Sequence, residues 1–175
     1  MERLLDIYNE NNLPLGKVEF ESVVYRHGLW HRTVLVVIHT PAGEVLEIKT
    51  SPKKTRNGLP DRFTQTCQLG LFSFVERGKK ERETACKMLE QILQKTPDEN
   101  ELRPWLVKII EENQDWEKKR EFRYIYFFQT EKDNLPDNCG NFIPINQAKN
   151  LFQKYSKNLG ENEDFWLDIL NELSN

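Results

Sequence analysis

Residues 32–39, RTVLVVIH, constrain the fold more than any other segment of this chain. They are dense in β-branched residues and apolar on both alternating faces, which is typical of a central strand buried on both sides. Pro41, Ala42 and Gly43 form a turn, and residues 44–49 alternate polar and apolar side chains as a hairpin partner does. We therefore expect a sheet that is covered on both faces.

Other elements are predicted from local patterns. Residues 5–8 and 15–18 read as a small hairpin, and residues 20–25 as helix or irregular structure. Residues 51–62 read as a loop, residues 63–74 as one or two short strands, residues 122–129 as a second central strand and residues 142–145 as a short strand. Residues 146–155 and 164–173 read as closing helices. The order of elements predicts an α+β fold with a mixed sheet between helices.

Two amphipathic helices are predicted in the middle of the chain. The first spans residues 81–93, and its apolar stripe consists of Ala85, Met88, Leu89, Ile92 and Leu93. The second spans residues 101–116, because apolar side chains recur there at steps of three and four. Trp105, on this second helix, and Trp166 are expected in the core.

Length and composition favour one domain over residues 1–175, with an N-terminal hairpin at about 4–18, a core at about 30–145 and C-terminal helices at about 146–173. Charged residues make up 30% of the chain, and the net charge is -3. Acids and bases are interspersed, which argues against dedicated nucleic-acid binding. The three cysteines lack metal-type spacing, and no apolar run is long enough for a membrane span. We expect a reduced, cytoplasmic protein with no membrane attachment.

Several segments resemble the Nudix hydrolase superfamily, and within it the branch close to isopentenyl diphosphate isomerase. Residues 6–16, DIYNENNLPLG, look like the opening hairpin of that branch, and residues 28–32 read GLWHR as it does. Residues 63–70 read FTQTCQLG, where the isomerases have a segment close to WTNTCCSH. The resemblance implies an α/β/α sandwich with a mixed β-sheet between helices.

The family's catalytic motif, the Nudix box, is a Gly, five residues, a Glu, seven residues and then Arg-Glu-apolar-x-Glu-Glu-x-Gly-apolar. In that motif the carboxylates bind magnesium against a diphosphate. When the box is aligned through the helix at residues 81–93, its first Gly falls on Ser73, its first Glu on Lys79 and its Arg on Lys87. The three Glu positions after the Arg fall on Met88, Gln91 and Ile92, and the closing Gly falls on Gln94. A second register retains a Gly and a Glu at Gly70 and Glu76, but neither register rebuilds the acidic pair that magnesium needs.

The isomerase chemistry is also incomplete. Its reactive cysteine falls on Gln68, and the following ligand histidine falls on Gly70. His31 matches a ligand histidine, although a single histidine at the start of a strand is also compatible with a packed, hydrogen-bonded role. Trp30 and His31 are expected to line the mouth of a cleft, and no metal site is predicted.

The first functional hypothesis is a Nudix-fold pseudoenzyme that has lost magnesium-dependent diphosphohydrolase activity and acts as a binding or regulatory module. The alternative is an active Nudix hydrolase on a nucleoside or isoprenoid diphosphate, with a non-standard acidic site drawn from Glu76, Glu81 and Glu83. Magnesium would be a cofactor only in that second case. An isopentenyl diphosphate isomerase-like enzyme is the third hypothesis.

A change of charge at the box suggests a ligand. Lys79 replaces the loop Glu of the box, and Lys87 replaces its Arg. Arg77 and Lys80 are basic residues close to Lys79 in the sequence. We expect a metal-independent anion site formed by Arg77, Lys79, Lys80 and Lys87, unless these are simply solvated charges. The partner would then be a diphosphate-containing small molecule or another protein. We also expect Met88 and Ile92 to close over part of the former metal face, because apolar side chains favour burial.

Overall fold

The structure is a computed structural model that describes residues 2–48, 68–93, 97–114, 117–136, 139–155 and 163–174. These residues group into two compact units. Unit 1 contains Met1–Val36 and Leu71–Phe128, and unit 2 contains Val37–Gly70 and Gln129–Asn175. The predicted loop at residues 51–62 lies outside the described residues.

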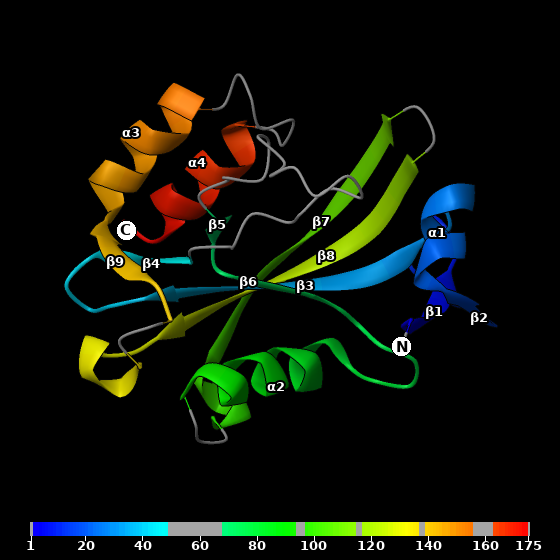
Figure 1. The fold of residues 1–175 in the computed structure, drawn as a ribbon, viewed down its shortest axis with the longest axis horizontal. Helices are drawn as coiled ribbons and strands as arrows, with labels where there is room; N and C mark the ends of the chain where they lie inside the picture. Colours follow the sequence, from blue (N-terminus) through cyan, green and yellow to red (C-terminus); the bar gives the residue numbers. More distant parts are fainter. Residues whose placement is uncertain are drawn as a thin grey trace, which may run out of the picture. The chain divides into compact units, whose positions relative to one another are not determined.

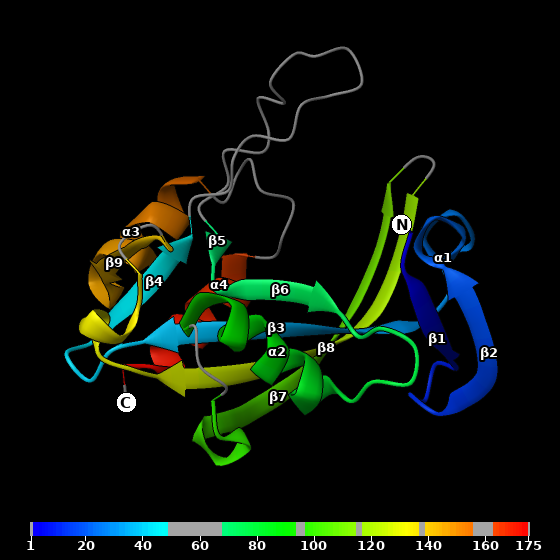
Figure 2. The ribbon, with the colours of Figure 1, turned by 60° about the horizontal axis from the view of Figure 1, so that its bottom comes forward.

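Unit 1 is built on a mixed sheet. Strand β6 (Leu71–Phe74) pairs antiparallel with β3 (His31–His39), and β7 (Leu102–Gln114) pairs antiparallel with β8 (Glu117–Gln129). Strands β3 and β8 are neighbours and run in the same direction (Figures 1 and 2). The predicted α+β class with a mixed sheet is therefore confirmed.

Strand β3 forms the centre of the core, as its sequence predicts. Val34, Val36, Val37 and Ile38 are completely buried, and Leu35 is 2% exposed. Each such side chain contributes roughly 1.5–3 kcal/mol relative to an exposed position. Side chains that point to both faces of the strand are buried, so both faces of β3 must be covered.

The N-terminal segment forms the predicted hairpin and a short helix. Strands β1 (Leu4–Tyr8) and β2 (Pro14–Phe20) pair antiparallel, and α1 (Glu21–His27) follows. Gly28 ends α1 in the left-handed conformation, with a φ of 61°. Within unit 1, Leu5, Ile7 and Val24 pack together with Phe74 of β6 as one apolar cluster.

Arg32, on β3, holds the hairpin turn in place. Its Nε and Nη2 groups donate to the side chain and backbone oxygens of Asn12 at 2.8 and 3.0 Å, and its Nη1 donates to Glu81 at 2.6 Å. The guanidinium also lies 4.0 Å from the ring centroid of Tyr8. Asn12 has a φ of 60° and donates to the Tyr124 hydroxyl at 2.9 Å. One arginine therefore connects the hairpin to β3 and to the helix that begins at residue 81.

The predicted helix over residues 101–116 is wrong, because residues 102–114 form strand β7; residues 115 and 116 lie outside the described residues. Strand β7 pairs with β8 from Leu102 opposite Phe128 to Gln114 opposite Glu117. Two of the apolar residues that suggested a helical stripe, Ile109 and Ile110, are β-branched and pack well on a pleated sheet. A long aromatic partner strand thus decides between two patterns that the local sequence allows.

Strand β7 has features of an edge strand. It is the last strand in the order of the described sheet, so Pro104 removes no donor that a further strand would need. Its register against β8 shifts between Pro104 and Val107, which marks a β-bulge. Trp105, expected in the core, is only half-buried and lies 5.5 Å from the ring centroid of Phe127.

Unit 2 contains the remaining strands and two helices. Strand β4 (Glu44–Ile48) pairs antiparallel with β5 (Gln68–Leu69) and with β9 (Asn141–Pro144), and Val45 lies opposite His39. Helix α3 (Ile145–Tyr155) packs against β9, β4 and α4 (Glu163–Glu172). Trp166 on α4 is buried, as predicted. Two short 3-10 helices, Glu99–Glu101 in unit 1 and Lys132–Asn134 in unit 2, complete the described elements.

Candidate functional site

Helix α2 (Glu81–Leu93) forms one wall of the candidate site and has the predicted bounds. Ala85, Leu89 and Leu93 are buried on the side that packs into unit 1. Met88 and Ile92, which stand at carboxylate positions of the box, are half-buried. The helix therefore forms because its apolar stripe is covered, while a neighbouring part of its surface remains partly open.

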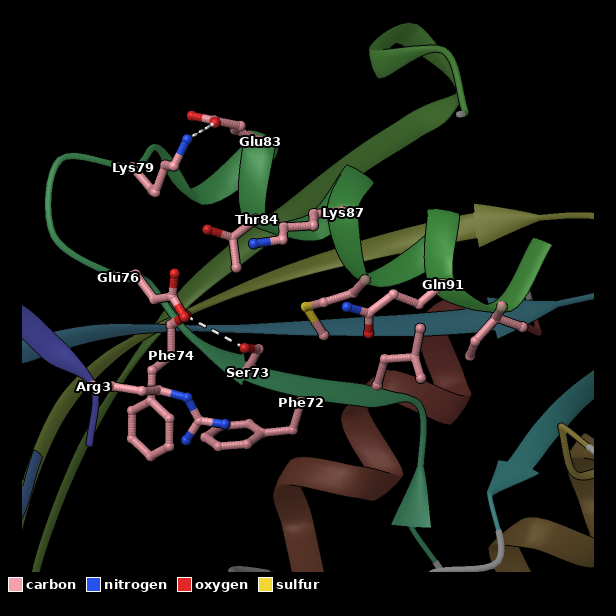
Figure 3. A pocket seen from close by; sticks show the side chains of 13 residues that line it. Arg3, Phe72, Ser73, Phe74, Glu76, Lys79, Glu83, Thr84, Lys87 and Gln91 are labelled. Atoms are coloured by element: carbon pink, nitrogen blue, oxygen red, sulfur yellow. Dashed lines mark hydrogen bonds and ion pairs between the residues drawn. The ribbon is translucent and has the colours of Figure 1, made fainter. Parts of the chain in front are cut away.

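A groove of about 320 Å³ lies in unit 1 between α2 and strand β6 (Figure 3). It is lined by residues of β6, of α2 and of the turn between them, together with one residue from the N-terminus. These residues are Arg3, Leu71, Phe72, Ser73, Phe74, Glu76, Lys79, Glu83, Thr84, Lys87, Met88, Gln91 and Ile92. We call this feature the α2–β6 groove.

The box positions converge on the α2–β6 groove. The described Gly, Glu and Arg positions of the first register all line it: Ser73, Lys79, Lys87, Met88, Gln91 and Ile92. These side chains carry a hydroxyl, two ammonium groups, a thioether, an amide and an alkyl group. Gln94 lies outside the described residues. The residues that the first register aligns with these motif positions therefore lie along one groove, and none of their side chains bears a carboxylate.

The donor set does not fit magnesium, which prefers several oxygen ligands including one or two carboxylates. In the part of the chain that the structure describes, no group of three His, Cys, Asp or Glu side chains could hold a metal ion. Glu76 and Glu83 are the two acids that line the groove. Glu83 is already bonded to Lys79, with Nζ and Oε1 separated by 2.6 Å.

All four residues of β6 line the α2–β6 groove. The Val75 N–H donates to the Arg32 carbonyl at 3.0 Å, and backbone groups alternate in direction along a strand. Leu71 and Ser73 therefore bond towards β3, whereas the N–H and C=O groups of Phe72 and Phe74 point to the opposite edge. In Figure 3, Ser73 lies on the α2 side of the strand, and the rings of Phe72 and Phe74 lie on the other side, next to Arg3.

Two of the basic groups in the groove are ion-paired. Arg3 bonds to Glu21 at 3.0 Å and lies 5.3 Å from the ring centroid of Phe74. The hydrogen bond between Lys79 and Glu83 raises the pKa of Lys79 and lowers the pKa of Glu83. Lys87 forms no hydrogen bond or ion pair with any residue that the structure describes. Its ammonium is therefore the cation most available to a ligand.

The predicted acids and bases are only partly brought together. Glu76 and Glu83 line the groove, but Glu81 does not, because it is bonded to Arg32. Lys79 and Lys87 line the groove as predicted for an anion site. Arg77 and Lys80 are exposed and lie outside the lining, since they sit on the turn that leads into α2.

Trp30 and His31 do not line the groove. Trp30 stacks on Phe122, with ring centroids 4.7 Å apart. His31 is 1% exposed, and its Nδ1 donates to the Leu29 carbonyl at 3.1 Å. The sequence-based expectation that these two residues line a cleft mouth therefore finds no support in the groove's geometry.

His31 belongs to a buried polar cluster that sequence reasoning missed. Its Nε2 lies 3.8 Å from Oε2 of Glu121, and the other Glu121 oxygen accepts from Nε of Arg123 at 2.9 Å. Burial lowers the pKa of His31, although the Leu29 carbonyl and Glu121 oppose that effect. The available signal was a pair of charged residues at alternate positions, Glu121 just before the predicted central strand and Arg123 within it. Because Arg123 already neutralises the carboxylate, this cluster does not resemble a metal site.

No helix among the described residues has the length and apolar character needed to cross a membrane. Comparison with protein-family models gives no match. Comparison with curated proteins gives none either.

Solved structures do match. The crystal structure of DR0079 from Deinococcus radiodurans is 13% identical, with a TM-score of 0.62, and the match covers 86% of this chain and 89% of that one. The solution structure of DR0079, described as a hypothetical Nudix protein, is 13% identical, with a TM-score of 0.47 and coverage of 93% and 87%. A mutT/nudix family protein from Listeria innocua is 17% identical, with a TM-score of 0.48 and coverage of 68% and 81%. Since the first likeness spans most of both chains, this protein has the fold of DR0079, which is the Nudix fold.

Proposed function

We propose that this Nudix-fold protein is a binding module that holds an anionic ligand in the α2–β6 groove without magnesium and without hydrolysis. One observation carries the proposal. In the first register, the described Gly, Glu and Arg positions of the box line a single groove, and none of them bears a carboxylate.

The replaced side chains favour an anion over a cation. Magnesium assists hydrolysis by offsetting charge on the phosphate and by orienting the attacking water, and both roles need ligands that fix the ion. Met88 and Ile92 supply no such ligand. Lys87 instead offers a positive charge that can pair directly with phosphate or carboxylate.

The alternative of an active hydrolase is supported by the position of Glu76 and Glu83 in the groove. It is opposed by the Lys79–Glu83 ion pair, because a carboxylate that holds magnesium must give up that partner. An isomerase-like activity has less support, since Gln68 stands where that chemistry needs a cysteine.

The test has a hydrolysis arm and a binding arm. Nucleoside and isoprenoid diphosphates are incubated with the protein at increasing magnesium concentration, and no turnover is expected. Magnesium-dependent turnover that is lost in Glu76→Gln or Glu83→Gln would establish the alternative. Pyrophosphate binding is then measured by calorimetry in EDTA, where millimolar affinity is expected.

Two charge-reversal variants locate the binding. Lys87→Glu should weaken pyrophosphate binding at least about tenfold, because attraction becomes repulsion. Lys80→Glu is the matched control, since it changes the net charge equally but lies outside the groove lining. Equal effects of the two variants would mean that the α2–β6 groove is not the anion site.

A further inference from the structure

We propose that the natural occupant of the α2–β6 groove is an extended acidic peptide segment of a partner protein, which pairs with the open edge of β6 as an additional strand. This inference rests on the proposed function, because it takes the same groove as a binding site and Lys87 as its anion-recognising group. It goes further by naming the class of ligand.

The first argument is the open backbone edge. Among the described residues, β6 pairs with β3 alone. The N–H and C=O groups of Phe72 and Phe74 point to the other edge, and both residues line the groove. From the described residues, the Phe74 carbonyl accepts only a long bond of 3.3 Å from its neighbour Ser73. A ligand that satisfies alternating donors and acceptors along a strand edge is another peptide backbone.

The second argument is that the groove opens onto both faces of β6. On one face lie α2 and the side chains of Ser73, Thr84, Lys87 and Gln91, as Figure 3 shows. On the other face lie the rings of Phe72 and Phe74 (Figure 3). A strand placed along this edge sends its side chains alternately to the two faces. A small ion would use one face only.

The third argument sets the sequence of the peptide. A residue opposite Ser73 points to the α2 face, where Lys87 offers its ammonium, so this residue should be Glu or Asp. The residues before and after it lie beside Phe72 and Phe74, and aromatic side chains pair well with β-branched neighbours across strands. The recognised core is therefore apolar, acidic, apolar, for example Val-Glu-Val.

The charge of the groove agrees with a single acidic residue. Three basic and two acidic side chains line it, and two of the basic ones are ion-paired. Without a metal ion, a diphosphate would place several negative charges beside Glu76 and Glu83. One carboxylate matches the single available ammonium of Lys87. A cavity of about 320 Å³ is at the lower end of ligand-pocket volumes, which suits a short segment.

The probe is the acetylated, amidated pentapeptide Ser-Val-Glu-Val-Ser, titrated by calorimetry into the full chain in EDTA. We expect a dissociation constant of about 1 mM or tighter. The Ser-Val-Lys-Val-Ser peptide should bind at least about tenfold more weakly. A Val-Glu-Val peptide methylated on both valine nitrogens keeps its charge and side chains but loses its backbone donors, and should also weaken at least about tenfold.

Exchanging the charges gives the sharpest result. The Lys87→Glu variant should no longer bind the Val-Glu-Val peptide and should bind the Val-Lys-Val peptide instead. The Lys80→Glu variant should bind both peptides as the unmodified protein does. Circular dichroism confirms that each variant is folded. This double exchange would show that residue 87 faces the acidic side chain.

The outcomes separate the two proposals. If pyrophosphate binds in a Lys87-dependent manner but the peptide does not, the anion-binding proposal stands and the peptide inference fails. Unweakened binding of the methylated peptide overturns strand addition, because its donors are absent. If neither pyrophosphate nor peptide binds at millimolar concentration, both proposals fail.

Discussion

At the scale of single residues, the buried polar cluster of His31, Glu121 and Arg123 is the most constrained chemistry in unit 1. Removing charges from water is costly, and the Arg123–Glu121 pair offsets that cost only while both partners remain. His31 Nε2 and the second Glu121 oxygen lack a hydrogen-bond partner among the described residues. The neutral form of His31 is therefore the one that the folded protein favours.

This environment predicts a pH dependence of stability. Burial lowers the pKa of His31, so in the window below the usual histidine value of about 6.5 the unfolded chain binds a proton that the folded chain does not. The free energy of unfolding should therefore fall as the pH drops below about 6.5, by at most about 1.4 kcal/mol per pH unit from this group. Urea unfolding between pH 5.5 and 7.5 measures the slope.

Two histidine variants isolate the effect. His31→Gln should be less stable at neutral pH but should have a shallower slope, because the titrating group is gone. His27→Gln replaces an exposed histidine at the end of α1 and should leave the slope unchanged. Equal slopes for the unmodified protein and His31→Gln would contradict this account.

Lys87, Met88, Gln91 and Ile92 could be placed at a common site from the sequence, because a helical period and a family motif fix their spacing. Arg3 could not, because it reaches the groove from a distant point of the chain. The open backbone groups of Phe72 and Phe74 could not be predicted either. Which groups of a strand point outwards depends on which neighbour it pairs with, and β6 is short enough to pair on either side.

At the scale of elements, the turn after α1 is fixed by close packing. Gly28 has a φ of 61°, and a Cβ added there would lie 2.8 Å from Cβ of Lys118 on β8. Gly16 has a similar φ of 65°, but a Cβ there would meet nothing within 4 Å. The two glycines share one backbone conformation and differ in their surroundings.

Gly16→Ala should lower the free energy of unfolding by roughly 1 kcal/mol, which is the cost of the left-handed conformation alone. Gly28→Ala should cost about 2–4 kcal/mol, because it adds overpacking against a strand. Urea denaturation of both variants gives the comparison. Similar losses for the two would mean that Lys118 moves aside at little cost.

Whether a segment forms a helix or a strand was predictable where its apolar pattern fits only one of the two. Residues 32–39 are apolar on both faces and admit only a buried strand, and residues 81–93 have a stripe with helical period. The sequence of residues 101–116 is compatible with a helix and with a strand. Pairing with β8 stabilises the strand over residues 102–114. The ion pairs of Glu111 with Arg120 and Glu112 with Lys119 support that pairing, but they are visible only when both strands are known.

At the scale of the whole molecule, the distribution of acids bears on its response to metal. The described residues contain no cluster that could hold a divalent ion, so magnesium should not favour the folded state over the unfolded one. Adding 10 mM magnesium should shift the melting temperature by less than about 1 °C in a thermal scan. A larger rise that disappears in Glu76→Gln would indicate a metal site in the groove, and Glu2→Gln is the matched control at an acid outside its lining.

The contacts around Arg32 connect segments that are far apart in the chain. Asn12 bonds to Tyr124 across 112 positions, and Arg32 bonds to Glu81 across 49. Because Glu81 and Tyr124 follow the hairpin in the chain, they are synthesised after it, and these contacts form only once those residues have been made. Contacts between distant positions also slow folding, because a long loop must close before they form. The hairpin turn is thus stabilised late, by residues that are synthesised well after it.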